Sequence, residues 1–212
     1  TFALTGDSII TRKLSVYTEP AFTRLIALVR GADAAFTNIE MLFHDFEMYP
    51  RNESGGPCMR AEPALAKDLA WAGFDLGSLA NNHTGDYGVA GMRLTQKYVA
   101  EAGILAAGVG QSLVEAREAK FLETAKGRVA LISVSSTFPD HARAGTTRGD
   151  VPPRPGLNPL RFTTTYVVTP ERFEQLRLAA GEVTGRPAAA GDVLTFVGRR
   201  FVAGATPGIR TE

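Results

Sequence analysis

Short apolar runs alternate with longer amphipathic stretches along the first half of the chain. The short runs have the length of buried strands, and they are Phe2–Leu4, Ala34–Ile39, Phe74–Ala80 and Ile104–Gly110. In the stretches between them, apolar residues recur at helical spacing, which predicts helices over residues 19–30, 63–72 and 89–102. This alternation predicts an α/β fold, in which right-handed crossovers build a sheet with helices on both faces.

The rest of the chain has shorter predicted elements and two long loops. We expect a helical turn over residues 113–118 and a helix over residues 170–180. Five further strands are expected over residues 121–124, 128–135, 162–168, 193–197 and 200–202, the last two as a hairpin. Residues 129–132 have the composition of a core segment. Residues 41–60 are predicted to form a surface loop, and residues 137–160 a loop or lid. Loops as long as these usually have a function. The prediction is one domain over residues 1–212, with a core (1–136), the lid (137–160) and C-terminal strands and helix (161–212).

Composition narrows the class of protein. The chain has 212 residues, 44% of them hydrophobic, and a formal net charge of +1. The charge and the absence of a basic block give no argument for nucleic acid or an anionic membrane as a partner. Cys58 is the only cysteine, which excludes an intrachain disulfide and a cysteine metal cluster.

The sequence also bears on location. No run approaches the roughly 18 apolar residues that span a bilayer, and no signal peptide is visible. A cytoplasmic location is therefore favoured. The chain nevertheless starts at Thr1, without a methionine and inside an apolar segment. Association with the cell envelope is the alternative if an N-terminal segment has been removed.

Candidate chemistry gathers where the predicted strands end. Asp7 follows the first strand, Glu40 the second and Asn81-Asn82-His83 the third. Because the carboxyl ends of parallel strands share one edge of a sheet, we expect these side chains to converge on one crevice. An Asn-Asn-His turn is more than the chain needs for reversal, since Thr84 and the following glycine already supply turn chemistry.

Two carboxylates, an amide and an imidazole suit Mn²⁺, Fe²⁺, Zn²⁺ or Mg²⁺. Asp7 would ligate one metal ion, Glu40 would bridge, and Asn82 would ligate a second ion, so that a bound water could attack. His83 would protonate a leaving oxygen or bind an oxyanion. Asp86 either orients His83 or caps the following helix.

Other polar residues complete the predicted site. His141 and Arg143 in the predicted lid would bind a carboxylate or phosphate of an anionic substrate, and a plain exposed loop is the alternative. Asn81 and Asp86 are also predicted to contact substrate. His44 is expected to be a packed or surface loop residue instead of a ligand.

These residues carry a resemblance to a known family. Gly6-Asp7, Asn38-Ile39-Glu40 and Ala80-Asn81-Asn82-His83, followed by Asp86 and Gly88, resemble the CapA family of poly-γ-glutamate capsule biosynthesis, which is related to the calcineurin-like metallophosphoesterases. The similarity covers about residues 1–135. It implies a layered α/β metallophosphoesterase-like sandwich, with Asp7, Glu40 and Asn82 at metal positions and Asp7 and His83 at catalytic ones. It also implies a metal-dependent hydrolase or transferase acting on a phosphoester or γ-glutamyl polymer, with capsule-synthesis proteins as partners.

The chain departs from this family in one respect. Such domains usually add histidine ligands from later strands, whereas the only histidine after His83 is His141. We therefore expect a domain incomplete at its C-terminus, or a short form with a degenerate site, and a divalent metal that binds weakly or is absent. Two other functions stay open. One is a metal-free peptide epimerase, in which Asp7 and His83 exchange protons at a substrate α-carbon. The other is a non-catalytic component that binds an anionic polymer.

Overall fold

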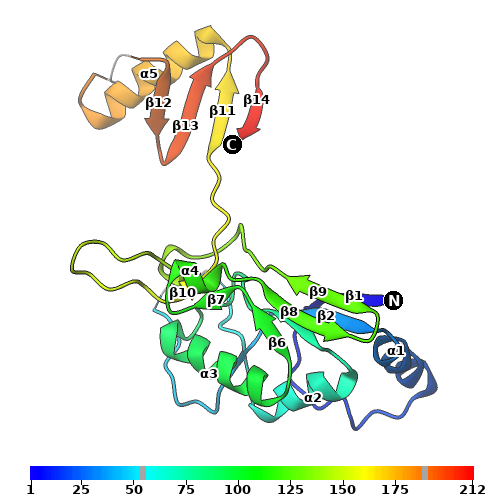
Figure 1. The fold of residues 1–212 in the computed structure, drawn as a ribbon. Coiled ribbons are helices and arrows are strands. Elements are labelled where there is room, and N and C mark those ends of the chain that lie inside the picture. Colours follow the sequence, from blue (N-terminus) through cyan, green and yellow to red (C-terminus); the bar gives the residue numbers. More distant parts are fainter. Residues whose placement is uncertain (53–55, 188–190) are drawn as a thin grey trace. The chain divides into compact units, whose positions relative to one another are not determined.

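The computed structural model describes residues 1–52, 56–187 and 191–212 of the chain. These residues form two compact units, residues 1–160 and 161–212 (Figure 1). The predicted single domain thus consists of two units, and the second begins where the predicted lid ends. Residues 53–55 of the predicted loop over 41–60 lie outside the described residues.

A parallel sheet forms the centre of the first unit. Its four strands lie in the order β1 (Phe2–Ser8), β2 (Ala34–Ile39), β5 (Leu76–Ser78) and β6 (Leu105–Ala107). The connections between them are the helices α1 (Pro20–Arg30), α2 (Ala64–Ala72) and α3 (Gly88–Glu101). The predicted α/β fold with a parallel sheet is confirmed.

The three helices lie on the same side of the sheet. Helix α1 contacts α2, α2 contacts α3, and Figure 1 shows all three below the strands. The prediction of helices on both faces was wrong. The strand order β1-β2-β5-β6 advances in one direction only. Right-handed crossovers that never reverse direction place every helix on one face.

The core of the first unit lies between this sheet and its helices. Its most deeply buried large side chains include Ile39, Phe43, Leu69, Val99 and Leu157. Helix α1 begins at a proline, which suits the first turn of a helix, and turns Ile26 and Val29 inward. Strand β1 is one of the two edge strands of the sheet, with Phe2 48% exposed and Leu4 67% exposed.

The predicted strand over residues 104–110 is interrupted at Gly108. Its φ of +100° ends β6 at Ala107, and the chain continues as β7 (Val109–Gly110). Strand β7 pairs antiparallel with β10 (Gly156–Leu157), which lies inside the predicted lid. A Cβ at Gly108 would lie 2.4 Å from the hydroxyl oxygen of Ser133. The left-handed backbone and the close contact both require glycine here.

Shorter elements flank the sheet. Strands β3 (Leu42–Phe43) and β4 (Arg60–Ala61) pair at the two ends of the predicted surface loop. The others are α4 (Leu113–Ala116), the hairpin of β8 (Lys120–Thr124) and β9 (Gly127–Leu131), and the 3-10 turn η1 (Asp140–Ala142). The prediction that residues 129–132 are core was wrong, since Ile132 is 65% exposed. The hairpin pairs with no third strand in the described part of the chain, so it stays largely open to solvent.

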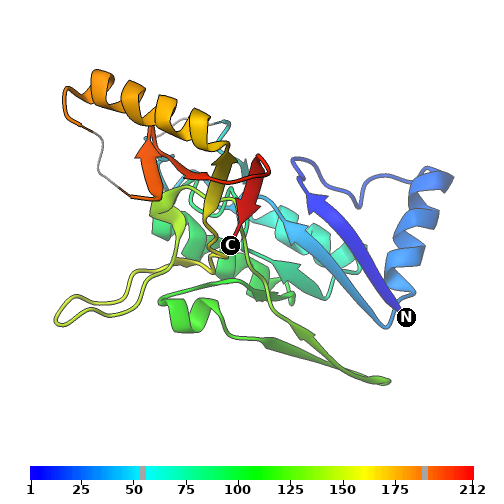
Figure 2. The same cartoon turned by 90° about the horizontal axis from the view of Figure 1, so that it is seen from above.

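The second unit is a small α/β layer. Helix α5 (Pro170–Thr184) packs on a sheet of order β12-β13-β11-β14, formed by Val193–Phe196, Arg199–Ala203, Thr164–Val168 and Gly208–Thr211 (Figure 2). Phe173 and Ala180 of the helix and Leu194 of the sheet form its core. Strand β14 was not predicted. Across the described residues of both units, no helix is both long and apolar enough to cross a membrane.

Candidate functional site

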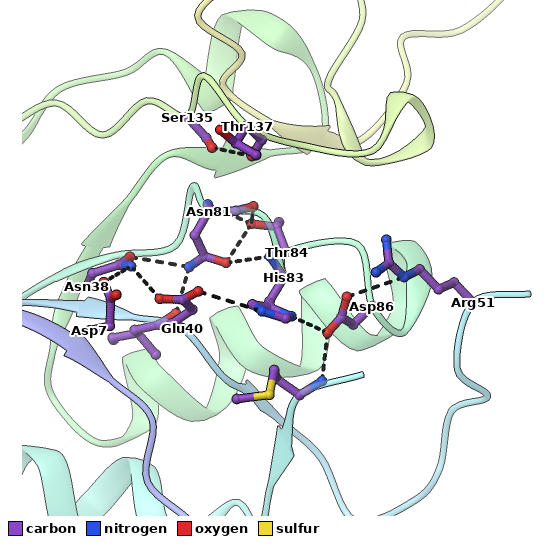
Figure 3. Close-up of polar contacts among 12 residues, drawn as sticks. Asp7, Asn38, Glu40, Arg51, Asn81, His83, Thr84, Asp86, Ser135 and Thr137 are labelled. Carbon is purple, nitrogen blue, oxygen red and sulfur yellow. Dashed lines mark hydrogen bonds and ion pairs between the residues drawn. The ribbon is translucent and has the colours of Figure 1, made fainter. Parts of the chain in front are cut away.

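Asp7 and Glu40 meet at the carboxyl ends of β1 and β2, and Asn38 lies between them (Figure 3). The Asn38 Nδ2 donates to Asp7 Oδ1 at 2.8 Å and approaches Glu40 Oε2 at 3.4 Å. A β-bulge between Leu4 and Asp7 places Asp7 directly opposite Asn38 in the ladder. The predicted convergence of strand ends therefore occurs, and Asn38 is its bridge.

Asn81 ties the third strand end to the second. Its Nδ2 donates to the carbonyl oxygen of Ile39 at 2.9 Å and to Asn38 Oδ1 at 3.3 Å. Its Oδ1 accepts the backbone N–H of His83 at 3.0 Å. All three contacts are internal to the protein and Asn81 is buried. This side chain fixes the turn after β5 against β2.

The turn itself is closed by Thr84. The Thr84 hydroxyl donates to the carbonyl oxygen of Leu79 at 2.6 Å and accepts the backbone N–H of Asn81 at 3.0 Å. Both Thr84 and Asn81 are buried. The turn that carries His83 is therefore held by buried hydrogen bonds at both of its ends.

His83 lies between two carboxylates. Its Nδ1 is 2.7 Å from Asp86 Oδ2, and its Nε2 is 3.6 Å from Glu40 Oε1 (Figure 3). A carboxylate can only accept, so Asp86 fixes the ring proton on Nδ1 and directs Nε2 toward Glu40. Helix α3 has Tyr87 at its N-cap and no side-chain cap. Of the three roles predicted for Asp86, its contacts match the orientation of His83, and contact with a substrate stays a prediction.

The loop between β3 and β4 holds Asp86 from the other side. Asp86 has no exposed surface, and its Oδ2 accepts the backbone N–H of Met59 at 2.6 Å. Arg51 donates its backbone N–H to the carbonyl oxygen of Asp86 at 2.8 Å, and its Nε lies 3.5 Å from Asp86 Oδ1. The sequence analysis missed Arg51 and Met59. No spacing pattern links residues that meet across a loop.

The electrostatics of the two carboxylates follow from their proximity. The pKa of Glu40 is raised above its ordinary value, first by burial and then by the hydrogen bond and the charge of Asp7. His83 and the Asn82 side chain act in the opposite direction. Glu40 is 9% exposed, whereas Asp7 is exposed. Two acids in contact favour a shared proton or a bound cation.

The donor set decides what cation could be held here. Asp7 and Glu40 offer carboxylate oxygens and Asn82 an amide oxygen, which suits a hard divalent ion. Among the described residues, no group of three or more His, Cys, Asp or Glu side chains is placed to hold a metal ion. The residues present could therefore supply some of the ligands of a metal ion, but not all of them. Its other coordination positions would fall to water, substrate or further ligands.

The predicted lid residues lie in two different settings. The His141 Nε2 is 3.3 Å from the carbonyl oxygen of Gly85, which places η1 against the turn that carries His83. A small cavity of about 20 Å³ lies at this contact. Arg143 instead forms an ion pair with Asp140 at 3.1 Å. Contact of either residue with a substrate stays a prediction.

A parallel α/β sheet with this cluster of acids, amides and histidine at its strand ends matches the metallophosphoesterase-like class of proteins. The family model described as "Bacterial capsule synthesis protein PGA_cap" matches residues 1–180, and the chain belongs to this family. The resemblance noted from the sequence is thereby confirmed.

Two curated relatives extend this comparison. They are the uncharacterized proteins y4sH and y4uA of Sinorhizobium fredii (strain NBRC 101917 / NGR234), each 41% identical to the chain over 180 residues. The match covers 84% of this chain and 39% of each relative. The chain therefore spans well under half the length of the curated relatives it matches.

Proposed function

We propose that the cluster around Glu40 and His83 is the acid–base and cation-binding part of an active site that hydrolyses or transfers a phosphoester or γ-glutamyl amide in capsule synthesis. Membership in a capsule-synthesis family supports the pathway. The observation that carries the chemistry is the Asp7–Glu40 carboxyl pair beside a histidine whose ring is oriented by Asp86. Charged substrate groups and a divalent ion are the partners that such a pair accommodates.

Each residue has a distinct role in this proposal. Asp7, Glu40 and Asn82 would hold a divalent ion, which when bound supplies polarisation of the scissile group and activation of water. Because Asp86 holds one ring proton on Nδ1, His83 would act as the acid in its doubly protonated form and donate the proton on Nε2 to the departing oxygen or nitrogen. Asn38 keeps the two carboxylates in a fixed relation.

A second candidate is metal-free epimerisation of a peptide. The donor set favours it, because the described residues offer fewer than three strong metal ligands in one place while the proton-transferring groups are complete. Asp7 would remove the proton from a substrate α-carbon, and His83 would return one from the opposite face. This candidate predicts that Asp7→Asn abolishes turnover in the presence of a chelator.

Metal binding separates these candidates. Elemental analysis after desalting, and titration with Mn²⁺, would compare the wild type with Asp7→Ala. Asp192→Ala in the second unit is the matched control, since it removes an exposed acid far along the chain. We expect about one or two equivalents of metal, lost in Asp7→Ala and retained in Asp192→Ala. No binding even in excess Mn²⁺ would refute the metal-dependent function and leave epimerisation.

The non-catalytic alternative has a separate test. Binding of polyglutamate that persists in the double variant Asp7→Asn, His83→Gln, with no turnover by the wild type, would support a role in polymer binding. Turnover by the wild type that the double variant loses would exclude it.

A further inference from the structure

His44 is a buried histidine whose ring makes no hydrogen bond. Its side chain has no exposed surface, and neither Nδ1 nor Nε2 has a hydrogen-bond partner in the described part of the chain. The ring packs edge-on against Tyr87, with centroids 4.2 Å apart, and Phe46 lies 6.5 Å away. Buried polar groups are nearly always hydrogen-bonded. This imidazole is therefore held in its pocket by packing alone.

The charged groups nearest to His44 oppose each other. Burial lowers the pKa of His44 from its ordinary value, and the positive charge of Arg60 lowers it further. Glu47 and Asp45 act to raise it. The Glu47 carboxylate is 3.9 Å from Nδ1, too far for a hydrogen bond, and its side chain is 40% exposed. A protonated ring would thus be repelled inside the protein and attracted toward its surface.

Tyr87 and helix α3 supply the remaining titratable groups at this contact. The pKa of Tyr87 is raised by burial, by Cys58 and by Asp86, and Arg60 opposes them. The Tyr98 hydroxyl donates to Glu47 at 3.4 Å. None of these groups gives a protonated His44 a buried acceptor. The acids nearest to it are the two of its own turn, Glu47 and Asp45, and Asp45 already pairs with Arg60 at 3.3 Å.

The backbone around His44 is strained. Phe46 has a φ of +59°, a left-handed conformation that costs an aromatic residue free energy. The Arg60 guanidinium lies 3.5 Å from the centre of the Phe46 ring and so covers this turn. The turn over residues 44–47 therefore has a strained backbone, and this strain would be relieved if His44 were released.

We propose that His44 is an acid-sensitive latch for the segment made of residues 44–52 and 56–60, the described part of the loop between β3 and β4. When the ring takes up a proton, it leaves the pocket beside Tyr87 and turns toward Glu47 and Asp45. The cost of an unpaired charge without solvent drives this movement. The segment then loses its packed anchor and opens.

The opening reaches the candidate site through Asp86. The segment contributes the backbone N–H of Met59 and the Arg51 contacts that hold Asp86, and Asp86 in turn orients His83. A loosened segment leaves His83 without its fixed partner. The opening of the segment does not depend on the proposed function. Only the effect of the opening on turnover rests on that function.

Hydrogen exchange of the whole chain tests the latch without substrate and in chelator. Amides of residues 44–52 and 56–61 would be compared at about pH 7.5 and 5.5, after correction for intrinsic exchange rates. The ring has a lowered pKa when packed and its ordinary value of 6.5 when released. The open form therefore binds the proton more readily, so that opening is favoured as pH falls below 6.5. One proton gives an increase of up to about tenfold in the opening constant across this range.

Variants separate His44 from other titrating groups. His44→Phe fills the pocket with a ring that cannot be protonated, so its segment should exchange equally at both pH values. His141→Gln removes another histidine and should keep the wild-type response. Arg60→Met removes a positive charge that lowers the pKa of the packed ring, so the ring should tolerate a proton in place and the increase in exchange between the two pH values should be smaller.

Two results would overturn the latch. One is equal protection of the wild-type segment at both pH values, and the other is a His44→Phe variant that keeps the pH response. If His44→Phe fails to fold, ring NMR of the wild type decides the matter. A His44 signal that titrates without any change in the amides of the segment would then refute it.

Discussion

Replacing Asp86 by alanine should strongly destabilise the first unit. The Asp86 carboxylate accepts hydrogen bonds from Met59 N–H at 2.6 Å and His83 Nδ1 at 2.7 Å, with no exposed surface. Each hydrogen bond to a charged group contributes about 1.5–3 kcal/mol. Removing one member of a buried charged network costs about 3–5 kcal/mol, because Arg51 is then left without its counter-charge. We therefore expect the free energy of unfolding to fall by about 3–5 kcal/mol.

Urea unfolding followed by Trp71 fluorescence measures this loss, since Trp71 is the only tryptophan and lies in the first unit. Asp68→Ala is the matched comparison. Asp68 is also buried and accepts the backbone N–H groups of Leu14 and Ser15, but it does not contact His83. Both changes should lower the free energy of unfolding. At Asp86, the more conservative change Asp86→Asn should also reduce turnover, whereas a change at Asp68 should not. A loss below about 1 kcal/mol for Asp86→Ala would refute the view that this carboxylate anchors the loop.

Three further changes test the fold and the site. Gly108→Ala places a side chain on a left-handed backbone and 2.4 Å from Ser133, so urea unfolding should show a fall of about 2 kcal/mol or more in the free energy of unfolding. At Gly6 a Cβ meets nothing within 4 Å, so the control Gly6→Ala should change it by no more than about 0.5 kcal/mol. Thr84→Val removes two buried hydrogen bonds and should cost about 1–3 kcal/mol in the same assay, and an unchanged midpoint would contradict this. Because the pKa of Glu40 is raised in the folded chain, its stabilising contribution is present below pH 4.5 and is lost as the pH rises through the pKa of the folded state. In chelator, Glu40→Gln should therefore stabilise the chain at about pH 8 relative to wild type and give less gain at about pH 5, and an equal gain at both would refute the carboxyl pairing.

Much of the fold could be predicted from local patterns in the sequence. Strand β2 and helix α1 lie where short apolar runs and helical spacing predict them, since each depends on residues adjacent in sequence. The break at Gly108 could not be seen in this way, because an apolar run with a glycine is compatible with one continuous strand. It arises from pairing with β10, nearly fifty residues later along the chain. The side of the sheet that the helices occupy was also missed, because it depends on strand order, which no local pattern encodes.

The candidate site divides along the same line. Asp7, Glu40 and His83 could be grouped from the sequence because parallel strands bring their carboxyl ends together. Asn38 was within reach too, since it lies two positions before Glu40 and so on the same face of β2. The contacts of Arg51 and Met59 with Asp86 are different. They depend on the path of an irregular loop, whose conformation is fixed by tertiary packing instead of by spacing.

The outer position of β1 has a practical consequence for handling the protein. Among the residues that the structure describes, no strand pairs with one side of β1, so this side presents backbone N–H and C=O groups beside the exposed Phe2 and Leu4. Such an edge accepts a strand from another molecule, which seeds aggregation. Solutions of this chain should thus associate as concentration rises, and Leu4→Lys should delay turbidity by placing a charge at the edge. The same strand delivers Asp7, so self-association at this edge would deplete the population with an accessible first carboxylate.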